Sequence, residues 1–423
     1  MSRKMLLTAL TGLICLGSAP AFGQAGCTTG DGCASEAECA DESCGERLFG
    51  NGWTSLTNQL KAAGCGAQTV GGDGCGAGDG SCGQGDGLPG GRGGDGFSLA
   101  NMLGSDGESG IEIGGWLQFG YQNRDAVVPR FNTYEERVNL HQGWLYAEKV
   151  ADGSSGFDWG FRVDGMYGVD AANTQAFGNN PGNWDFQNGF DNGQYGFAIP
   201  QAYAEVASGD WSVKVGHFYT IVGYEVVTAP DNFFYSHAFT MFNSEPFTHT
   251  GFVATYNASD DLTLYGGWTL GWDTGYDQFG NGSNFLGGAS LALSEDTTLT
   301  YITTIGDFGA RGTGGYGHSI VLDMSLTDDL NYIVQSDFVE TDTPGDRQYG
   351  LNQYLIYNIN DSVGVGGRVE WWNTGGVSVY DATVGLNIKA SDNLIFRPEV
   401  RQDWSPGFGI ADTFFGMDAI LTF

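Results

Sequence analysis

The chain has 423 residues, of which 50 are acidic and 17 are basic, so its formal net charge is −33 at pH 7. So acidic a chain repels the phosphate backbone of nucleic acids, and no basic stripe with interleaved aromatic residues offsets the repulsion. Composition therefore excludes nucleic acid as a partner. The length allows several soluble domains or one large barrel, and the abundance of aromatic residues suits a barrel with interfacial girdles.

The amino terminus, residues 1–23, has the pattern of a secretory signal peptide. Positive residues, an apolar core and a small-residue cleavage site follow one another: Arg3 and Lys4, Leu6–Leu16, and Ala19–Ala21 or Ala21–Gly23. No segment reaches the roughly 18 uninterrupted apolar residues of a transmembrane helix. An export signal without such a helix leaves the periplasm, the exterior and the outer membrane as destinations.

Residues 24–110 differ in composition from the rest and are expected to form a largely irregular linker rich in Cys, Gly and Asp. They hold seven of the eight cysteines, namely Cys27, Cys33, Cys39, Cys44, Cys65, Cys75 and Cys82. Exported cysteines tend to oxidise, so intrachain disulfides are expected, and an odd count leaves one thiol for another partner. This segment contains no Cys-x-x-Cys pair and no His lies nearby, so a zinc site is not expected here.

Residues 111–423 have the alternating pattern of a transmembrane β-barrel. Apolar residues recur at every second position over segments of about ten residues, separated by Gly, Asp, Asn and Ser. We therefore expect an all-β fold, an antiparallel barrel of about sixteen strands. The expected strands are Ile111–Gln122, Val138–Lys149, Phe157–Tyr167, Ile199–Ala207, Trp211–Phe218, Phe247–Asn257, Leu262–Trp272, Phe285–Leu293, Thr297–Gly306, Gly315–Leu326, Leu330–Val339, Gln348–Asn358, Val363–Asn373, Val379–Lys389, Leu394–Trp404 and Ala411–Phe423.

The connections between these strands alternate between short and long. Tight breaks such as Ser259–Asp261 and Thr327–Asp329 contain the residues that turns favour. The long connections between them are 124–137, 168–198, 219–246 and 273–284. Outer-membrane barrels have short periplasmic turns and long outer loops, so both ends of the barrel are expected on the periplasmic side.

The cleaner strands place their charges on one face. In the strand at 157–167, Trp159 and Phe161 alternate with Asp158 and Arg162. A charge that faces lipid near the middle of the bilayer costs about 2–4 kcal/mol, so these charges are expected to face the lumen. A wall with ionisable groups requires water, and the pattern therefore predicts a channel. Alternation does not determine which residues face the lumen in the strands at 138–149, 247–257 and 348–358.

Two neighbouring motifs resemble a known family. They are Pro230–Ala238 and Glu245–Gly251, and the segments Gly114–Tyr121 and Gly216–Phe218 look similar too. On these residues the chain resembles the OmpL-like β-barrel porin family of planctomycete-type bacteria. The resemblance covers residues 111–423 and leaves out the Cys-rich segment. It implies an outer-membrane porin without an assigned substrate.

The connection 219–246 is the expected constriction of the pore. In sixteen-stranded porins a long loop near this point folds inward, and the resemblance implies the same here. The candidate constriction residues are Glu225, Asp231 and Glu245, because rings of charge at a constriction set ion preference. The aromatic residues of this loop either pack it against the wall or offer a track for sugars.

Opposite charge is expected from basic residues of the lumen wall, namely Arg162, Lys214, Arg368, Arg397 and Arg401. An acidic loop that faces such a wall would produce a transverse field, which orients polar solutes. We therefore expect Arg397 and Arg401 to contribute to ion selectivity. Both alternate with Glu399 and Asp403 in one strand, so neutralised pairs are the alternative interpretation.

No motif in the sequence points to an enzyme. The chain lacks a Gly-x-Ser-x-Gly elbow, a His-Glu-x-x-His pair, a phosphate-binding loop and an EF-hand loop. His237 and His249 are expected to be structural hydrogen-bonding residues rather than metal ligands. We expect no catalytic residue, no metal and no cofactor.

These features predict a passive outer-membrane porin for small hydrophilic solutes and ions. Its expected partners are outer-membrane lipid and those solutes, and the porin analogy implies a homotrimer. The alternative is an envelope scaffold protein, anchored by the barrel and cross-linked through the Cys-rich segment.

Overall fold

The computed structural model describes residues 110–124, 128, 130–178 and 182–423. The expected signal peptide and all the cysteines lie outside the described residues. One antiparallel sheet closes on itself, because β1 pairs with both β2 and β17. The strands are β1 (Glu112–Gln122), β2 (Arg137–Lys149), β3 (Asp158–Gly168), β4 (Gly196–Ala198), β5 (Ala202–Ser208), β6 (Trp211–Tyr219), β7 (Thr248–Ser259), β8 (Leu262–Thr269), β9 (Ser283–Ser294), β10 (Thr297–Asp307), β11 (Gly315–Thr327), β12 (Leu330–Glu340), β13 (Arg347–Asn360), β14 (Val363–Thr374), β15 (Val377–Ser391), β16 (Leu394–Ser405) and β17 (Ile410–Thr422).

The barrel has sixteen strand positions although seventeen strands are assigned, because β4 and β5 share one position. Both pair with β3, β4 along 166–168 and β5 along 158–163. The break between them contains Pro200, which has no backbone N–H to donate to a sheet. The predicted barrel of about sixteen strands is confirmed, and the strand expected at Ile199–Ala207 is the one that is interrupted.

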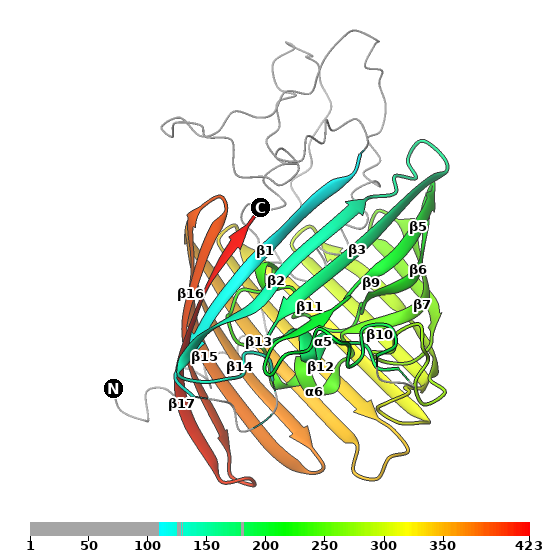
Figure 1. Ribbon diagram of the computed structural model, residues 1–423. Helices are drawn as coiled ribbons and strands as arrows, with labels where there is room; N and C mark the ends of the chain where they lie inside the picture. Colours follow the sequence, from blue (N-terminus) through cyan, green and yellow to red (C-terminus); the bar gives the residue numbers. More distant parts are fainter. Residues whose placement is uncertain (1–109, 125–127, 129, 179–181) are drawn as a thin grey trace, which may run out of the picture. The chain divides into compact units, whose positions relative to one another are not determined.

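The long loops lie at one end of the barrel and six two-residue turns lie at the other, although the turn 375–376 lies at the long-loop end. The carboxy terminus lies beside the start of β1, where Trp116 pairs with Thr422 (Figure 1). Two-residue turns such as 260–261 and 328–329 lie at this same end, because the strands alternate in direction. In outer-membrane barrels the short turns are periplasmic. This end is called the short-turn end below.

Side chains alternate between the barrel's outer and inner faces. On β11, Tyr316 and Ile320 are exposed on the outside, whereas Ser319 and Val321 are buried inside. The exposed row is the surface that lipid covers in such a barrel. Among the described residues, no helix has the length and apolar character needed to cross a membrane.

A β-bulge explains why the sequence of β2 does not alternate. Gln118 of β1 pairs with Gln142, whereas the next residue, Phe119, pairs with Leu140, so His141 is an extra residue. One extra residue shifts the alternation by one position for the rest of the strand. His141 is buried as a consequence, and its side chain lies within 3.6 Å of Asp170.

A charge placed on the outer face should destabilise the barrel according to its depth. We expect Leu355→Arg, in the middle of β13, to lower the free energy of unfolding by about 2–4 kcal/mol. Val363→Arg, beside a tight turn, is the matched control and should cost about 0–1 kcal/mol. Urea unfolding in lipid vesicles measures both. Equal losses would contradict the assignment of this face to lipid.

Candidate functional site

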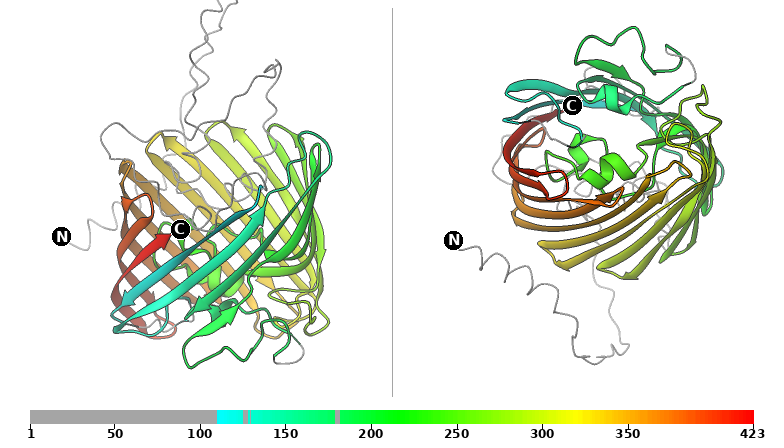
Figure 2. Two further views of the ribbon diagram at one scale, coloured as in Figure 1. Left: turned by 45° about the horizontal axis from the view of Figure 1, so that its top comes forward. Right: turned by 90° about the horizontal axis from the view of Figure 1, so that it is seen from below.

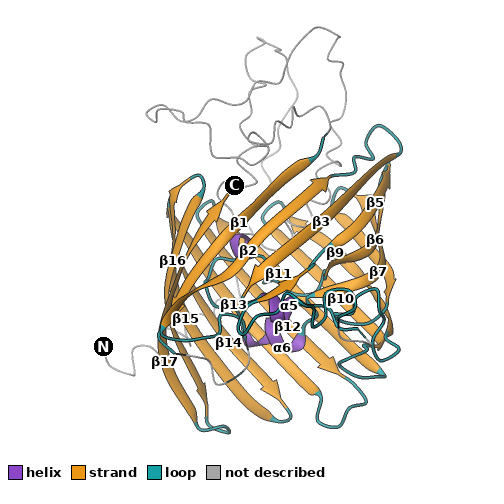
Figure 3. Cartoon of the chain, in the orientation of Figure 1, coloured by secondary structure: helices purple, strands orange, loops and turns teal. Residues whose placement is uncertain are grey.

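The connection between β6 and β7, residues 220–247, folds into the interior of the barrel and is called the inner loop. It contains two short helices, η1 (Ala229–Asp231) and α6 (Phe239–Ser244). Viewed along the barrel, α6 lies inside the ring of strands (Figure 2), and Figure 3 shows the helices against the strands. Asp231 is the only residue of the inner loop that is exposed. The loop is therefore a packed element rather than a mobile segment.

Arg368 of β14 links the inner loop to the wall. Its Nη1 donates to Glu225 Oε1 at 2.8 Å and to the carbonyl oxygen of Ser236 at 2.7 Å. Its Nε donates to Asp381 of β15 at 2.9 Å. The guanidinium is fully buried, so one cation joins a loop carboxylate, a loop carbonyl and a wall carboxylate.

Two arginines of β16 continue this attachment. Arg397 donates to the carbonyl oxygens of Ala229 at 2.7 Å and Asn232 at 2.6 Å. Arg401 donates to the carbonyl oxygen of His237 at 2.6 Å. Their carboxylate partners on the wall are Asp418, Asp381 and Asp403. These arginines are among the predicted basic residues of the lumen wall, and in the structure they face inward and are covered by the inner loop.

Two wall glutamates receive backbone N–H groups of the inner loop. Glu370 of β14 accepts both amides of Phe239–Thr240 at 2.7 Å. Glu399 of β16 accepts the amides of Tyr235–Ser236 at 3.0 and 3.1 Å. A carboxylate that accepts two consecutive amides fixes both the position and the direction of the backbone.

Glycines on the inner face of the wall leave room for loop side chains. A Cβ atom at Gly366 would lie 2.5 Å from the ring of Phe233, and one at Gly416 would lie 2.8 Å from the ring of Tyr235. Real Cβ atoms do not approach so closely, so a side chain at either glycine would displace a loop ring. The aromatic residues of the inner loop therefore pack against the wall.

The inner loop also contacts the side of the barrel that carries β1 and β2. Val227 and Met241 belong to one buried cluster with the stacked rings of Trp116 and Trp144. Gln142 of β2 donates to the carbonyl oxygen of Val227 at 2.7 Å. The loop thus spans the lumen from β2 to β16, and any route for water must pass it.

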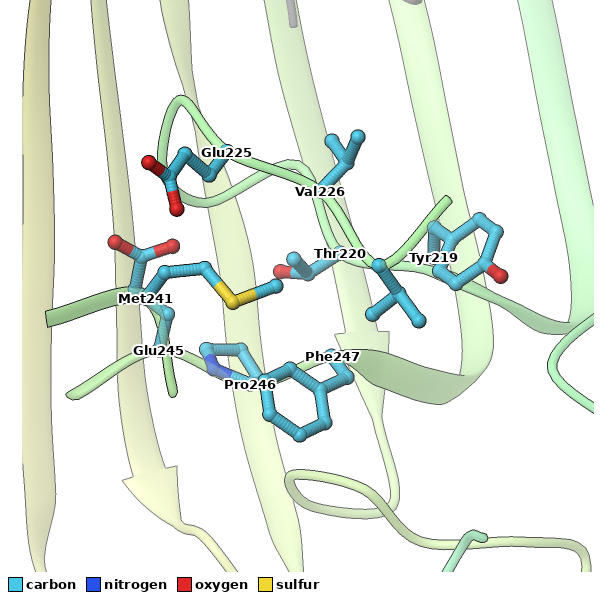
Figure 4. Close-up of a pocket in the computed structure, with 9 residues that line it drawn as sticks. Tyr219, Thr220, Glu225, Val226, Met241, Glu245, Pro246 and Phe247 are labelled. Carbon is cyan, nitrogen blue, oxygen red and sulfur yellow. The ribbon is translucent and has the colours of Figure 1, made fainter. Parts of the chain in front are cut away.

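Glu225 and Glu245 line a small pocket within the inner loop. Figure 4 shows both carboxylates on one side of the pocket and Tyr219 on the other. Glu225 accepts the amide of Ala238 at 2.7 Å in addition to the Arg368 guanidinium. Glu245 accepts from Gln335 Nε2 at 2.6 Å. Both candidate residues hold the shape of the loop through these bonds.

Asp231 is the exposed residue of the inner loop, and the two remaining basic candidates, Arg162 and Lys214, lie on the wall. Asp231 is within electrostatic range of Tyr219, as is Arg162 of β3. Arg162 is half-buried and pairs with Glu148 at 3.1 Å and Asp164 at 2.8 Å. Lys214 of β6 lies over the ring of Tyr203 at 4.9 Å. The structure therefore divides the candidate residues into a buried group and a water-facing group.

The histidines of this region are buried hydrogen-bonding residues. His237 lies 3.1 Å from the carbonyl oxygen of Val226, and His249 lies 3.2 Å from that of Gly271. Burial lowers the pKa of His237. Among the described residues, no group of three or more His, Cys, Asp or Glu side chains could hold a metal ion.

The sequence did not predict the wall residues that form hydrogen bonds with the backbone of the inner loop. They include Glu370, Glu399 and Gln142. The available signal was the alternation of Arg368 with Glu370 and of Arg397 with Glu399 on one strand face. This alternation indicates paired charges, but it does not show that the carboxylates bind amides of a segment more than 100 residues away in the chain.

Comparison with known proteins places the barrel in a family. Residues 110–423 match the family model described as "Putative beta-barrel porin-2, OmpL-like". Similar solved structures include OprB of Pseudomonas putida, with a TM-score of 0.53, 12% identity, and coverage of 77% of this chain and 96% of that chain. Another is the outer membrane channel DcaP of Acinetobacter baumannii, with a TM-score of 0.51, 11% identity, and coverage of 78% and 99%. No curated protein matches the chain.

The carboxy-terminal end of the inner loop should loosen as the pH rises. Asp273, in the connection from β8 to β9, accepts the amides of Phe247 and Thr248 at 2.7 and 3.0 Å. Burial raises the pKa of Asp273 to about 6 and raises that of Glu245 well above its usual range. The Asp273 contribution is therefore complete below about pH 4, the usual carboxyl range, and is lost as the pH rises through its folded pKa.

Hydrogen exchange of the Phe247 and Thr248 amides, corrected for intrinsic rates, measures this effect. We expect less protection at about pH 8 than at about pH 5. Asp273→Asn is the control and should flatten the dependence, because an amide does not titrate. Protection that rises with pH would contradict the expected direction.

Proposed function

We propose, from the premise that this chain belongs to the family "Putative beta-barrel porin-2, OmpL-like", that its barrel is a narrow passive channel for small hydrophilic solutes and ions. The protein is an outer-membrane porin, as its membership of a β-barrel porin family and its closed barrel indicate. The finer proposal concerns how solutes are limited, and it rests on the inner loop.

The observation that carries this proposal is the attachment of the inner loop to both sides of the lumen. Gln142 holds it at β2, and Arg368 and Arg397 hold it at β14 and β16. A loop fixed in this way sets a constant limit on solute size, because its position does not fluctuate widely. Small polar solutes are therefore the class that we propose to pass.

Within this proposal the candidate residues have two roles. Asp231, Arg162 and Lys214 face water at least in part, so they act on passing solutes through their charge. Glu225 and Glu245, with the three buried arginines, position the inner loop. We propose that the effect of Arg397 and Arg401 on selectivity is indirect, since both guanidinium groups are buried.

The partners follow from the same fold. Outer-membrane lipid covers the exposed apolar rows of the barrel. A homotrimer remains our proposal by analogy with porins. The alternative role as a cross-linked scaffold depends on cysteines outside the described residues, and no observation on the barrel favours it.

Releasing the inner loop should widen the channel. In Glu370→Gln with Glu399→Gln, four loop amides lose a charged acceptor, and each hydrogen bond to a charged group contributes about 1.5–3 kcal/mol. We expect larger and noisier single-channel conductance in planar bilayers than for the unmodified protein. Glu340→Gln, an exposed carboxylate paired with Arg347, is the matched control and should leave conductance unchanged.

Two outcomes would contradict the proposal. A folded, heat-modifiable barrel without conductance steps would show that the unmodified protein is not an open channel. Identical conductance in the double variant and the unmodified protein would show that the inner loop does not limit passage.

A further inference from the structure

The short-turn end of the barrel carries a ring of carboxylates. Six two-residue turns lie there, at 209–210, 260–261, 295–296, 328–329, 361–362 and 392–393. Every turn contains at least one acidic residue, none contains Lys or Arg, and all nine carboxylates are exposed: Asp210, Asp260, Asp261, Glu295, Asp296, Asp328, Asp329, Asp361 and Asp392. Turns favour Asp, but they also favour Asn, Gly and Ser. The formation of these turns therefore does not require an acidic residue in each of them.

The basic residues of the barrel are distributed differently. Arg124, Arg137, Arg311 and Arg347 lie at the long-loop end. Near the short-turn end the described residues include Lys149, which pairs with Asp158 at 3.0 Å, and Lys389. The long-loop end therefore carries both signs of charge, with acidic residues in excess, whereas the two-residue turns of the short-turn end carry acidic residues and no basic ones.

The inner wall next to the short-turn end continues this acidic character. Glu112, Glu148 and Arg162 lie in one row across β1, β2 and β3, since each pairs in register with the next. Glu112 is exposed, and Glu148 and Arg162 are half-buried. Arg162 has two carboxylate partners, Glu148 and Asp164, so its charge is more than compensated.

Further charged residues are found on β5, β6 and the inner loop. Lys214 of β6 is opposite Glu205 of β5 in the sheet register. Asp231 adds an exposed carboxylate on the inner loop. Among the residues of this group that are not buried, three are negative, Glu112, Glu148 and Asp231, and two are positive, Arg162 and Lys214. The partly or fully exposed residues of this group therefore have a formal charge of −1.

The strongest positive charges of the lumen do not offset this excess in water. Arg368 and Arg397 are 1% exposed and Arg401 is 0% exposed, and each is bonded to a carboxylate. A buried and paired cation contributes little field at the water-filled part of a pore. The arrangement differs from a pore whose arginines face the solute path.

We propose that this porin is selective for cations and that the acidic short-turn end sets the preference. Rings of carboxylates favour cation passage, and a low-dielectric wall focuses their field on the lumen. The proposal deepens the proposed function, on which it rests, by naming small cations as the solute class favoured by the channel. Solvent ions screen such charges, with a Debye length of about 10 Å at 0.1 M and about 3 Å at 1 M.

The test is the reversal potential of the full-length protein in a planar bilayer under a KCl gradient. We expect a permeability ratio of K⁺ over Cl⁻ well above unity, which falls as the overall salt concentration is raised. Asp328→Lys with Asp329→Lys should lower this ratio. The matched control is Glu135→Lys with Glu136→Lys, which changes the charge equally on exposed residues of the long-loop end and should lower the ratio less.

The outcomes separate this inference from the proposed function. Conductance steps with no preference, or with a preference for Cl⁻, would overturn the inference and leave the channel intact. An equal shift in both variants would overturn the role of the short-turn end. Absence of steps would overturn both. A heat-modifiability gel checks folding, and Asp260→Asn with Asp261→Asn provides a milder second variant at the same end.

Discussion

The position of the inner loop depends on a buried network of arginine and carboxylate groups on β14, β15 and β16. Burying a charge is unfavourable unless it is paired and fully hydrogen-bonded. Arg368 meets this condition by bonding to Glu225, Asp381 and a loop carbonyl at once. Because each wall charge needs a group from the loop, the loop has one favourable position. The network thus contributes specificity of position more clearly than net stability.

The same network separates the charges that shape the channel from those that act on solutes. A carboxylate that accepts amides of the inner loop, such as Glu399, has its oxygens occupied by these hydrogen bonds and positions the loop. An exposed carboxylate, such as Asp231, remains in contact with water. Loop shape and ionic preference are therefore controlled by different residues, and each can be changed without the other.

The sequence predicted the barrel well because alternation in a membrane is enforced by a large energetic cost at every outward position. The sequence could not predict which residues of β2 face the lumen, since the bulge at His141 depends on pairing with β1. It identified Arg368 and Glu225 separately but not their contact, because no local pattern relates residues 143 positions apart. Exposure of Asp231 and burial of Glu245 likewise follow from the fold of the loop rather than from residue type.

The chain separation between the inner loop and its wall partners has a consequence for assembly. The loop follows β6, whereas Arg397 and Glu399 arrive on β16, the penultimate strand. Contacts between distant segments form late, because a long stretch of chain must be ordered before they form. The inner loop can reach its final position only when the last strands are in place. Docking of the inner loop is therefore a late event in the biogenesis of the barrel, and a docked loop indicates that the last strands have been added.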